Sequence, residues 1–376
     1  MKYPFYRPES INAASFAKYF DEINSRRWYT NNGPLVRLLT SRLEEYLDVK
    51  NLLLVSSGTV ALQVAYKALQ RSGRIYTTPL SFIASSSAFG WLGNEIHYAD
   101  IDNRTLNLDP DSVRRLAALS EKDTVVATHL YGNPCDINAF DHLKNETQCK
   151  IIYDASHAFA TRFQGQSILS LGDASTVSFH ATKLYHTVEG GGVVFSNEDD
   201  LARAQKMINF GFNSQNEIEE VGINAKMSEL HAAVGLVVLD DLDVIIERRR
   251  AITDQYRSIL ESTEVSTTVI QEGTDLCSPS YMPIVVESAY ERERVQVSML
   301  QDGIETRNYF DSLQSTTELF EGSHKVLPNS QCFNKRVLCL PLYPELTSAD
   351  ITYICDRLQF NLANIRSEKP VSCARS

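Results

Sequence analysis

Residues 52–59 read Leu52-Leu53-Leu54-Val55-Ser56-Ser57-Gly58-Thr59, and this stretch decides how the first half of the chain is expected to fold. Consecutive apolar residues followed by small polar ones predict a short buried strand. Residues 60–69 then have the composition and length of a helix. A strand joined to a helix by a short glycine-containing turn is the building unit of α/β proteins, so the sequence predicts an α/β fold.

The same alternation continues on both sides of this stretch. Residues 35–47 have helical spacing, whereas residues 1–35 show no regular pattern and are expected to be irregular. A further helix is expected at residues 81–92. Strands are expected at residues 74–78, 95–99, 123–128, 149–153, 176–179 and 192–195. Strands separated by helical stretches or loops predict a mainly parallel mixed sheet.

The pattern changes after Asn224. Helices are expected at residues 227–239, 251–260 and 348–358, strands at 282–286 and 337–340, and a solvated charged stretch at 247–250. This mixture indicates a smaller α+β unit. We therefore expect a large α/β domain over residues 1–245, which includes the N-terminal segment, and a small C-terminal α+β domain over residues 246–376.

The overall composition argues against several classes of protein. The chain has 376 residues and a formal net charge of −11, whereas nucleic-acid-binding proteins usually present a basic face. Its 7 cysteines form no CxxC pair, so reduced thiols are expected rather than disulfides or a metal site. The sequence contains no run of about 18 apolar residues, so no membrane span is expected. The N-terminus shows no apolar signal core, and the cytoplasm is therefore the expected location.

Asp154 and Lys183 are the residues that indicate the chemistry. Asp154 follows the apolar residues of a predicted strand, and Lys183 follows the next predicted strand, just before a glycine-rich turn at residues 189–192. Pyridoxal phosphate (PLP) requires such a pair, because a lysine binds it as a Schiff base and a carboxylate keeps its pyridine nitrogen protonated. A lone lysine is usually a solvated surface cation, but these neighbours favour the cofactor.

Other residues are candidates for holding this cofactor. The stretch Ser57-Gly58-Thr59 lies between a strand and a helix, where N–H groups and the helix dipole bind phosphate; an ordinary helix N-cap is the alternative. Ser178 ends a predicted strand on the side expected to face the phosphate. Phe82 is interpreted as stacking on the pyridine ring, and otherwise as a core aromatic. His157 is a candidate donor to the ring hydroxyl, and otherwise a structural histidine.

The order of these motifs resembles the DegT/DnrJ/EryC1/StrS group of PLP-dependent nucleotide-sugar aminotransferases. The resemblance covers nearly the whole chain. It is carried by residues 28–34, 57–62, 77–82, 100–102, 129–134, 154–158, 178–183, 209–212, 222–229 and 340–344. The resemblance implies the fold type I aminotransferase architecture, with a large α/β domain and a small C-terminal α+β domain. It also implies a homodimer with active sites at the subunit interface.

The resemblance assigns roles to single residues. Lys183 stands at the position of the cofactor-binding lysine, and Asp154 at that of the partner of the pyridine nitrogen. The remaining positions are Gly58, Thr59 and Ser178 for the phosphate, Phe82 for stacking, His157 near the ring hydroxyl, and Asn224, lent to the phosphate by the neighbouring subunit. Taken alone, Asn224 is an ordinary loop residue before a helix. One branch of the family has histidine in place of the lysine and dehydrates sugars, so Lys183 indicates transamination.

The activity that the resemblance implies is amination of a dTDP-4-keto-6-deoxyhexose to the dTDP-4-amino-4,6-dideoxyhexose, with glutamate as the amino donor. Residues 28–34 are most similar to the viosamine-forming type, whose products enter O-antigen or antibiotic glycosides. The alternative is amination of an NDP-3-keto-6-deoxyhexose, and a more remote one is a non-catalytic PLP-fold binding protein. Residues 307–314 do not match the cluster with which many members bind the sugar nucleotide, so no sugar-binding residue is assigned.

Overall fold

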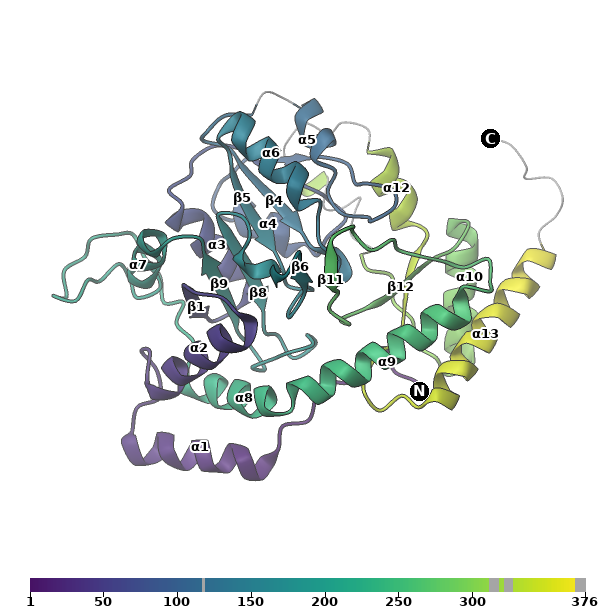
Figure 1. The fold of residues 1–376 in the computed structure, drawn as a ribbon, viewed down its shortest axis with the longest axis horizontal. Helices are drawn as coiled ribbons and strands as arrows, with labels where there is room; N and C mark the ends of the chain where they lie inside the picture. Colours follow the sequence, from purple (N-terminus) through teal and green to yellow (C-terminus); the bar gives the residue numbers. More distant parts are fainter. Residues whose placement is uncertain (117–118, 311–317, 321–326, 369–376) are drawn as a thin grey trace.

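The computed structural model describes residues 1–116, 119–310, 318–320 and 327–368. Its centre is a seven-stranded sheet with the strand order β1-β9-β8-β5-β4-β2-β3 (Figure 1). The strands are β1 (Leu52–Val55), β2 (Ile75–Thr77), β3 (Ile96–Tyr98), β4 (Thr124–Thr128), β5 (Lys150–Asp154), β8 (Ala174–Ser178) and β9 (Gly191–Phe195). Only β9 is antiparallel to its neighbours, β8 and β1, because the other pairings are parallel. The predicted mainly parallel mixed sheet is therefore confirmed.

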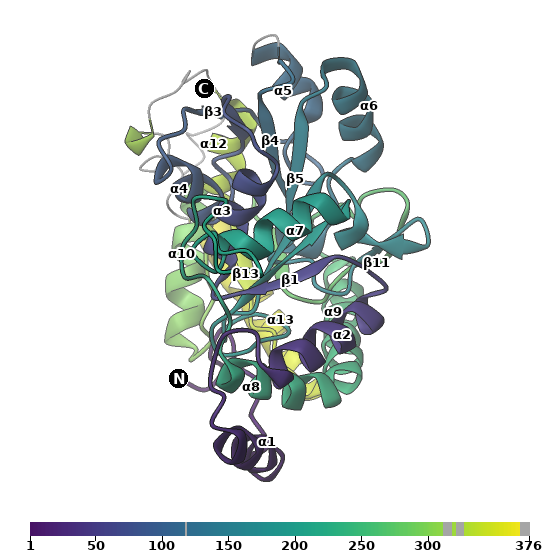
Figure 2. The same cartoon turned by 90° about the vertical axis from the view of Figure 1, so that its left-hand side faces the viewer.

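Helices cover both faces of this sheet (Figures 1 and 2). One face carries α3 (Gly58–Ala68), α4 (Ala84–Gly90) and α7 (Glu198–Met207), and the other carries α2 (Pro34–Leu47), α5 (Pro110–Leu116), α6 (Ile137–Thr147) and α8 (Glu229–Asp240). In β1, Leu52 and Leu54 join one apolar core, whereas Leu53 and Val55 join the other. Successive side chains of a strand point to opposite faces, so a sheet buried on both faces needs a continuous apolar run.

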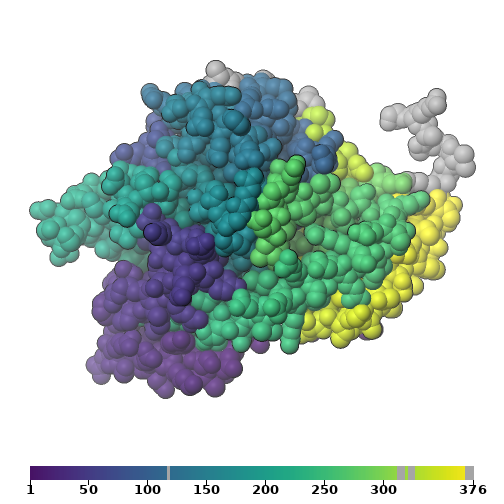
Figure 3. All heavy atoms as spheres, viewed as in Figure 1, coloured from purple at the N-terminus to yellow at the C-terminus, as the bar shows by residue number. Residues whose placement is uncertain are grey.

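The prediction is wrong for the N-terminal region, which contains the helix α1 (Ala13–Arg26). Asn12 caps this helix, because its side-chain oxygen accepts from the N–H groups of Ala14 and Ser15, both at 3.1 Å. The helix packs against α8 on the side away from the sheet and projects from the body of the molecule (Figure 3). Only Ile23 of its residues is buried, so the sequence lacks the apolar periodicity from which helices are predicted.

The C-terminal part forms a smaller α+β unit, as expected. Its antiparallel sheet consists of β10 (Ser266–Thr267), β12 (Met282–Val285) and β13 (Val337–Leu340). Its helices are α10 (Ala289–Gln301), α12 (Pro328–Asn334) and α13 (Ser348–Ser367). A third small sheet joins β6 (Arg162–Phe163), β7 (Gln166–Ser167) and β11 (Thr274–Leu276). Nowhere in the described ranges is a helix both long and apolar enough to cross a membrane.

Helix α9 (Leu242–Leu260) runs without interruption through the expected domain boundary at residue 245. Its two ends contribute to different apolar cores. Leu242, Ile245 and Ile246 belong to the core of the large unit, and Ile252, Tyr256 and Leu260 belong to the C-terminal core. We propose that the two domains meet within this helix.

The residues before α1 lie against the C-terminal unit, although the expected boundary groups them with the large domain. Tyr3 belongs to the C-terminal core, and its N–H donates to the carbonyl oxygen of Gly303 at 2.9 Å. An Oε of Glu9 lies 4.0 Å from an Nη of Arg249. Arg249 is only 5% exposed, so the charged stretch at residues 247–250 is not solvated throughout, contrary to expectation.

Candidate active site

A cavity lies at the carboxyl ends of the central strands. Strands β1, β5 and β8 run in the same direction, so the residues that follow them meet at one edge of the sheet. The sequence-predicted residues that line this cavity are Ser57, Gly58, Thr59, Phe82, Asp154, His157, Ser178 and Lys183. Tyr281, Tyr309 and Phe310 from the C-terminal part also line it, as do Ser81, Thr128 and Ser156. Asn224 does not line it.

Lys183 extends its amine into this cavity from the turn after β8. Its backbone N–H donates to the carbonyl oxygen of His180 at 2.9 Å, which fixes the turn. Its Nζ lies 3.5 Å from the hydroxyl of Tyr281, a contact at the long limit for a hydrogen bond. Burial lowers the pKa of Lys183 from its usual 10.5 to about 8, and the nearby Asp154 carboxylate partly opposes that shift. At pH 7 about a tenth of such an amine is unprotonated, far more than for a lysine of ordinary pKa.

Asp154 ends β5 and is 4% exposed. Its Oδ2 accepts from the hydroxyl of Ser85 at 2.7 Å. Its Oδ1 accepts from the hydroxyl and the N–H of Ser156, at 2.6 and 3.1 Å. Among the residues that the structure describes, no cation lies within ion-pair distance of this carboxylate. A buried carboxylate held only by hydrogen bonds in a cavity wall suits a cationic group on a bound molecule.

Glycines bring the start of α3 close to the ends of two strands. A Cβ on Gly58 would lie 2.7 Å from the Cβ of Ser178, and a Cβ on Gly191 would lie 2.7 Å from the nitrogen of Gly58. Ser57 is the N-cap of α3, and its side-chain oxygen accepts from the N–H of Val60 at 3.3 Å. The N-cap interpretation therefore holds for the Ser57 side chain. The first N–H groups of the helix still have no partner within it, which makes this terminus suitable for a phosphate.

Phe82 and His157 differ in their surroundings. Phe82 is 56% exposed, which contradicts the interpretation as a core aromatic. His157 is 3% exposed, and its Nδ1 accepts from the N–H of Tyr131 at 3.3 Å. Burial, with a smaller contribution from the Lys183 charge, holds the pKa of His157 well below its usual 6.5. A neutral ring that accepts at Nδ1 carries its proton on Nε2, so His157 remains able to donate one hydrogen bond.

Three residues of the site were not singled out from the sequence. Ser156 follows Asp154 by two positions, and this Asp-x-Ser spacing is a usable signal for a local turn. Ser85 is one of three consecutive serines, and the sequence does not show which of them contacts Asp154. Tyr281 is 98 residues beyond Lys183, and nothing near it in the sequence distinguishes it from a core tyrosine.

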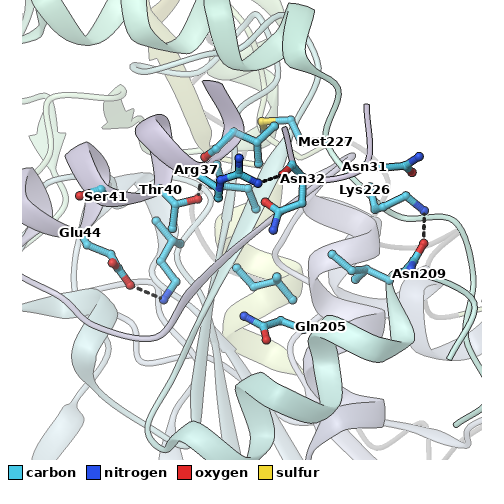
Figure 4. Close-up of a pocket in the computed structure, with 15 residues that line it drawn as sticks. Asn31, Asn32, Arg37, Thr40, Ser41, Glu44, Gln205, Asn209, Lys226 and Met227 are labelled. Carbon is cyan, nitrogen blue, oxygen red and sulfur yellow. Dashed lines mark hydrogen bonds between the residues drawn. The ribbon is translucent and has the colours of Figure 1, made fainter. Parts of the chain in front are cut away.

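Asn224 is exposed and forms an isolated β-bridge with Asn209. Asn209 lines a second pocket (Figure 4), which shares no lining residue with the Lys183 cavity. This pocket lies beside β1 and α2, and the segment after Asn224 also lines it. There the Nζ of Lys226 donates to Asn209 at 2.9 Å, and an Nη of Arg37 donates to the carbonyl oxygen of Asn32 at 2.6 Å. Asn224 therefore lies outside the lining of the Lys183 cavity of its own chain.

The site fits PLP in chemistry and in shape. It combines a lysine of lowered pKa, a buried carboxylate, a neutral histidine and a helix N-terminus that glycines leave accessible. In the described part of the chain, no cluster of three or more His, Cys, Asp or Glu residues is placed to hold a metal ion. A mainly parallel α/β sheet that carries this set at its strand ends defines the class of PLP-dependent aminotransferases.

Comparison with known proteins identifies the family. The DegT/DnrJ/EryC1/StrS aminotransferase family matches residues 10–359, and the chain belongs to this family. Its enzymes depend on PLP, which confirms the predicted cofactor and the predicted class of enzyme.

Several relatives match over most of their length. The dTDP-4-amino-4,6-dideoxy-D-glucose transaminase of Shigella dysenteriae is 34% identical, over 92% of this chain and 95% of its own. The GDP-perosamine synthase of Escherichia coli O157:H7 is 28% identical, over 95% of this chain and 98% of its own. The crystal structure of DesI in the presence of its TDP-sugar product superimposes with a TM-score of 0.88 and 31% identity, over 96% of this chain and 93% of DesI.

Proposed function

We propose that the protein transfers an amino group from glutamate to C4 of a dTDP-4-keto-6-deoxyhexose, which gives the dTDP-4-amino-4,6-dideoxyhexose. The observation that carries the proposal is the pair of Lys183 and Asp154 in one cavity at the strand ends. The chain that holds this pair aligns over 92% of its length with a transaminase that forms such a sugar. The similarity to DesI with its TDP-sugar product supports the same substrate class.

Bound PLP supplies an electron sink for the carbanion that forms at the α-carbon of the donor. Lys183 is the base that removes the proton from this carbon. Its lowered pKa leaves part of the amine population unprotonated near pH 7, which a lysine of pKa 10.5 does not provide. The hydroxyl of Tyr281, whose pKa burial raises, stays protonated and orients the Lys183 amine.

The other residues bind and orient the cofactor. Asp154 would hold the protonated ring nitrogen, because a buried carboxylate suits a positively charged partner. The Nε2 of His157 donates to the ring hydroxyl. Gly58, Thr59 and Ser178 hold the phosphate at the start of α3, where N–H groups and the helix dipole favour an anion. Phe82 covers the ring; its exposed side chain is available for this contact.

Visible spectroscopy tests both halves of the reaction. The protein is loaded with PLP, glutamate is added, and dTDP-4-keto-6-deoxyglucose follows. We expect the band of the lysine-bound cofactor to disappear with glutamate and to return with the sugar. Loss without return contradicts the sugar, and no initial band contradicts the role of Lys183. A GDP-4-keto-6-deoxyhexose is the matched comparison, because one relative is a GDP-perosamine synthase.

Amination at C3 of an NDP-3-keto-6-deoxyhexose is the alternative that the sequence left open. Mass spectrometry and proton NMR of the product distinguish an amine at C4 from one at C3. The Lys183 and Asp154 pair argues against the remote alternative, a non-catalytic binding protein of this fold. The cytoplasm remains the proposed location, supported by the six described cysteines, which are all free.

A homodimer with shared active sites is part of the proposal. It is supported by Asn224, which is exposed and lies outside the cavity of its own chain. Mixing inactive Lys183→Ala and Asn224→Ala subunits tests this role, because one of the two sites in a mixed dimer then has both residues intact. We expect the mixture to recover part of the wild-type activity. A protein that is active as a stable monomer contradicts the cross-subunit role of Asn224.

A further inference from the structure

Ser85, in the first turn of α4, holds one oxygen of Asp154. Its side chain is fully buried, and its hydroxyl donates to Oδ2 at 2.7 Å. The other oxygen, Oδ1, is held by Ser156, which is only two residues along the chain. Ser85 is 69 residues away from Asp154, so its contact depends on the packing of α4 at the end of β5. The two carboxylate oxygens are therefore fixed from different parts of the fold.

Two more buried hydroxyls, those of Ser81 and Thr128, contact Ser85, and both of these residues line the cavity. The Oγ of Ser81 lies 2.8 Å from that of Ser85 and 3.0 Å from the Oγ1 of Thr128. An ionised carboxylate only accepts hydrogen bonds, so Ser85 donates to Asp154 and accepts from its neighbours. By the same reasoning Ser81 donates to Ser85. Thr128 then donates to Ser81 or, at 3.4 Å, to Ser85 itself. In either arrangement the neighbouring hydroxyls donate toward Ser85, which leaves the Ser85 proton for Asp154.

We propose that Ser85, supported by Ser81 and Thr128, is a positioning residue for the aminotransferase reaction. It fixes Oδ2 of Asp154 in the position from which the carboxylate would meet the ring nitrogen of PLP. Ser85 does not line the cavity, whereas Asp154 does, so Ser85 acts through Asp154 and not on the substrate. The inference rests on the proposed role of Asp154.

Two neighbouring serines give a matched test. Ser86 is also buried, at 2% exposure, but its hydroxyl bonds Tyr98 instead of Asp154. We expect Ser85→Ala to raise the dissociation constant of PLP about tenfold and to lower kcat about tenfold, because a hydrogen bond to a charged group is lost. KM for the sugar should not change. Ser86→Ala should match the wild type, and Ser85→Cys, a weaker donor, should fall between Ser85→Ala and the wild type.

Thr128→Val tests the direction of the hydroxyl chain. Thr128 lines the cavity, so only the difference between two backgrounds reports on the hydroxyl chain. We expect Thr128→Val to raise the dissociation constant of PLP about threefold more in the wild type than in the Ser85→Ala background, where the chain is already broken. The dissociation constant is measured by absorbance with PLP alone, so it does not depend on the sugar. If Asp154→Asn changes neither PLP dissociation nor kcat, the proposed role of Asp154 fails. If Asp154→Asn has its effect but Ser85→Ala behaves like Ser86→Ala, only the role of Ser85 is overturned.

Discussion

The cavity has two walls that differ in origin and in chemistry. The sheet wall consists of Gly58, Asp154, Ser178 and Lys183, which follow parallel strands or lie at their ends. The aromatic wall consists of Tyr281, Tyr309 and Phe310 from the C-terminal part. Neighbouring rings in the aromatic wall lie 5.4 and 4.9 Å apart between centroids. The sheet wall carries the charges, whereas the aromatic wall limits their hydration.

The pKa of Lys183 shows what this division achieves. Burial lowers it, and the Asp154 carboxylate in the sheet wall opposes the change. If only acidic groups surrounded Lys183, they would keep its amine protonated. If only aromatic rings surrounded it, the cavity would lack a carboxylate to balance the positive charge of the bound cofactor. The amine is useful as a base because both walls act on it. The following predictions test each wall in turn, and they begin with the largest expected effect.

Lys183→Ala removes the reacting group of the sheet wall. We expect the visible band of the bound cofactor to disappear and kcat to fall about 10⁴-fold, because the base for the proton transfer is missing. Single-turnover absorbance with glutamate measures this loss. The control is Lys67→Ala, which changes an exposed lysine in α3. Turnover by Lys183→Ala at the wild-type rate would show that another residue carries the chemistry.

Asp154→Asn keeps the shape of the sheet wall and removes its charge. The cofactor should still bind, but kcat should fall on the order of 10²-fold or more, because the ring nitrogen loses the group that keeps it protonated. The aromatic wall is unchanged in this variant. Steady-state rates together with the amount of PLP retained after dialysis distinguish this result from simple loss of the cofactor.

The pH dependence tests the balance between the two walls. Since the unprotonated Lys183 amine is the base, the proton-transfer rate should fall about tenfold for each pH unit below about 8 and level off above it. The direction follows from the lowered pKa: protonation as the pH falls converts the base into an inactive cation. Stopped-flow rates with α-deuterated glutamate, compared with the unlabelled donor, isolate this step. A flat profile from pH 6 to 9 would contradict the assignment.

Tyr281→Phe leaves the ring of the aromatic wall in place and removes its hydroxyl. We expect a fall in kcat of about tenfold or less, because the Lys183 amine keeps its surroundings and loses one orienting contact. Tyr256→Phe is the matched control, since Tyr256 is fully buried and its hydroxyl has no partner among the described residues. If the two variants have the same kcat, the 3.5 Å contact has no role in the reaction.

The sheet wall was predictable from the sequence, and the physical reason is local. Asp154 and Ser178 end strands that the apolar pattern identifies, and parallel strands bring their carboxyl ends to one edge. Gly58 stands at the one turn where a strand meets the start of a helix with small residues. Each of these sequence patterns is contained within about ten residues, so it can be recognised without knowledge of the tertiary fold.

The aromatic wall was not predictable in the same way. Tyr281 reaches Lys183 only because the C-terminal unit folds back over the strand ends, across 98 residues of sequence. The contact of Ser85 with Asp154 is likewise a product of packing, because the next residue, Ser86, is also a buried serine and does not make this contact. Helix α1 was missed for the opposite reason, since it buries too little apolar surface to leave a periodic signal. Residues 311–314, part of the stretch that matched no family cluster, lie outside the described residues.

Helix α9 has a consequence for dissecting the protein. This uninterrupted helix supplies side chains to two apolar cores. Leu242 at its start belongs to the core of the large unit, and Leu260 at its end belongs to the C-terminal core. Cutting the chain at residue 245 would expose apolar groups on both fragments, so neither half is expected to be stable as a separate recombinant product.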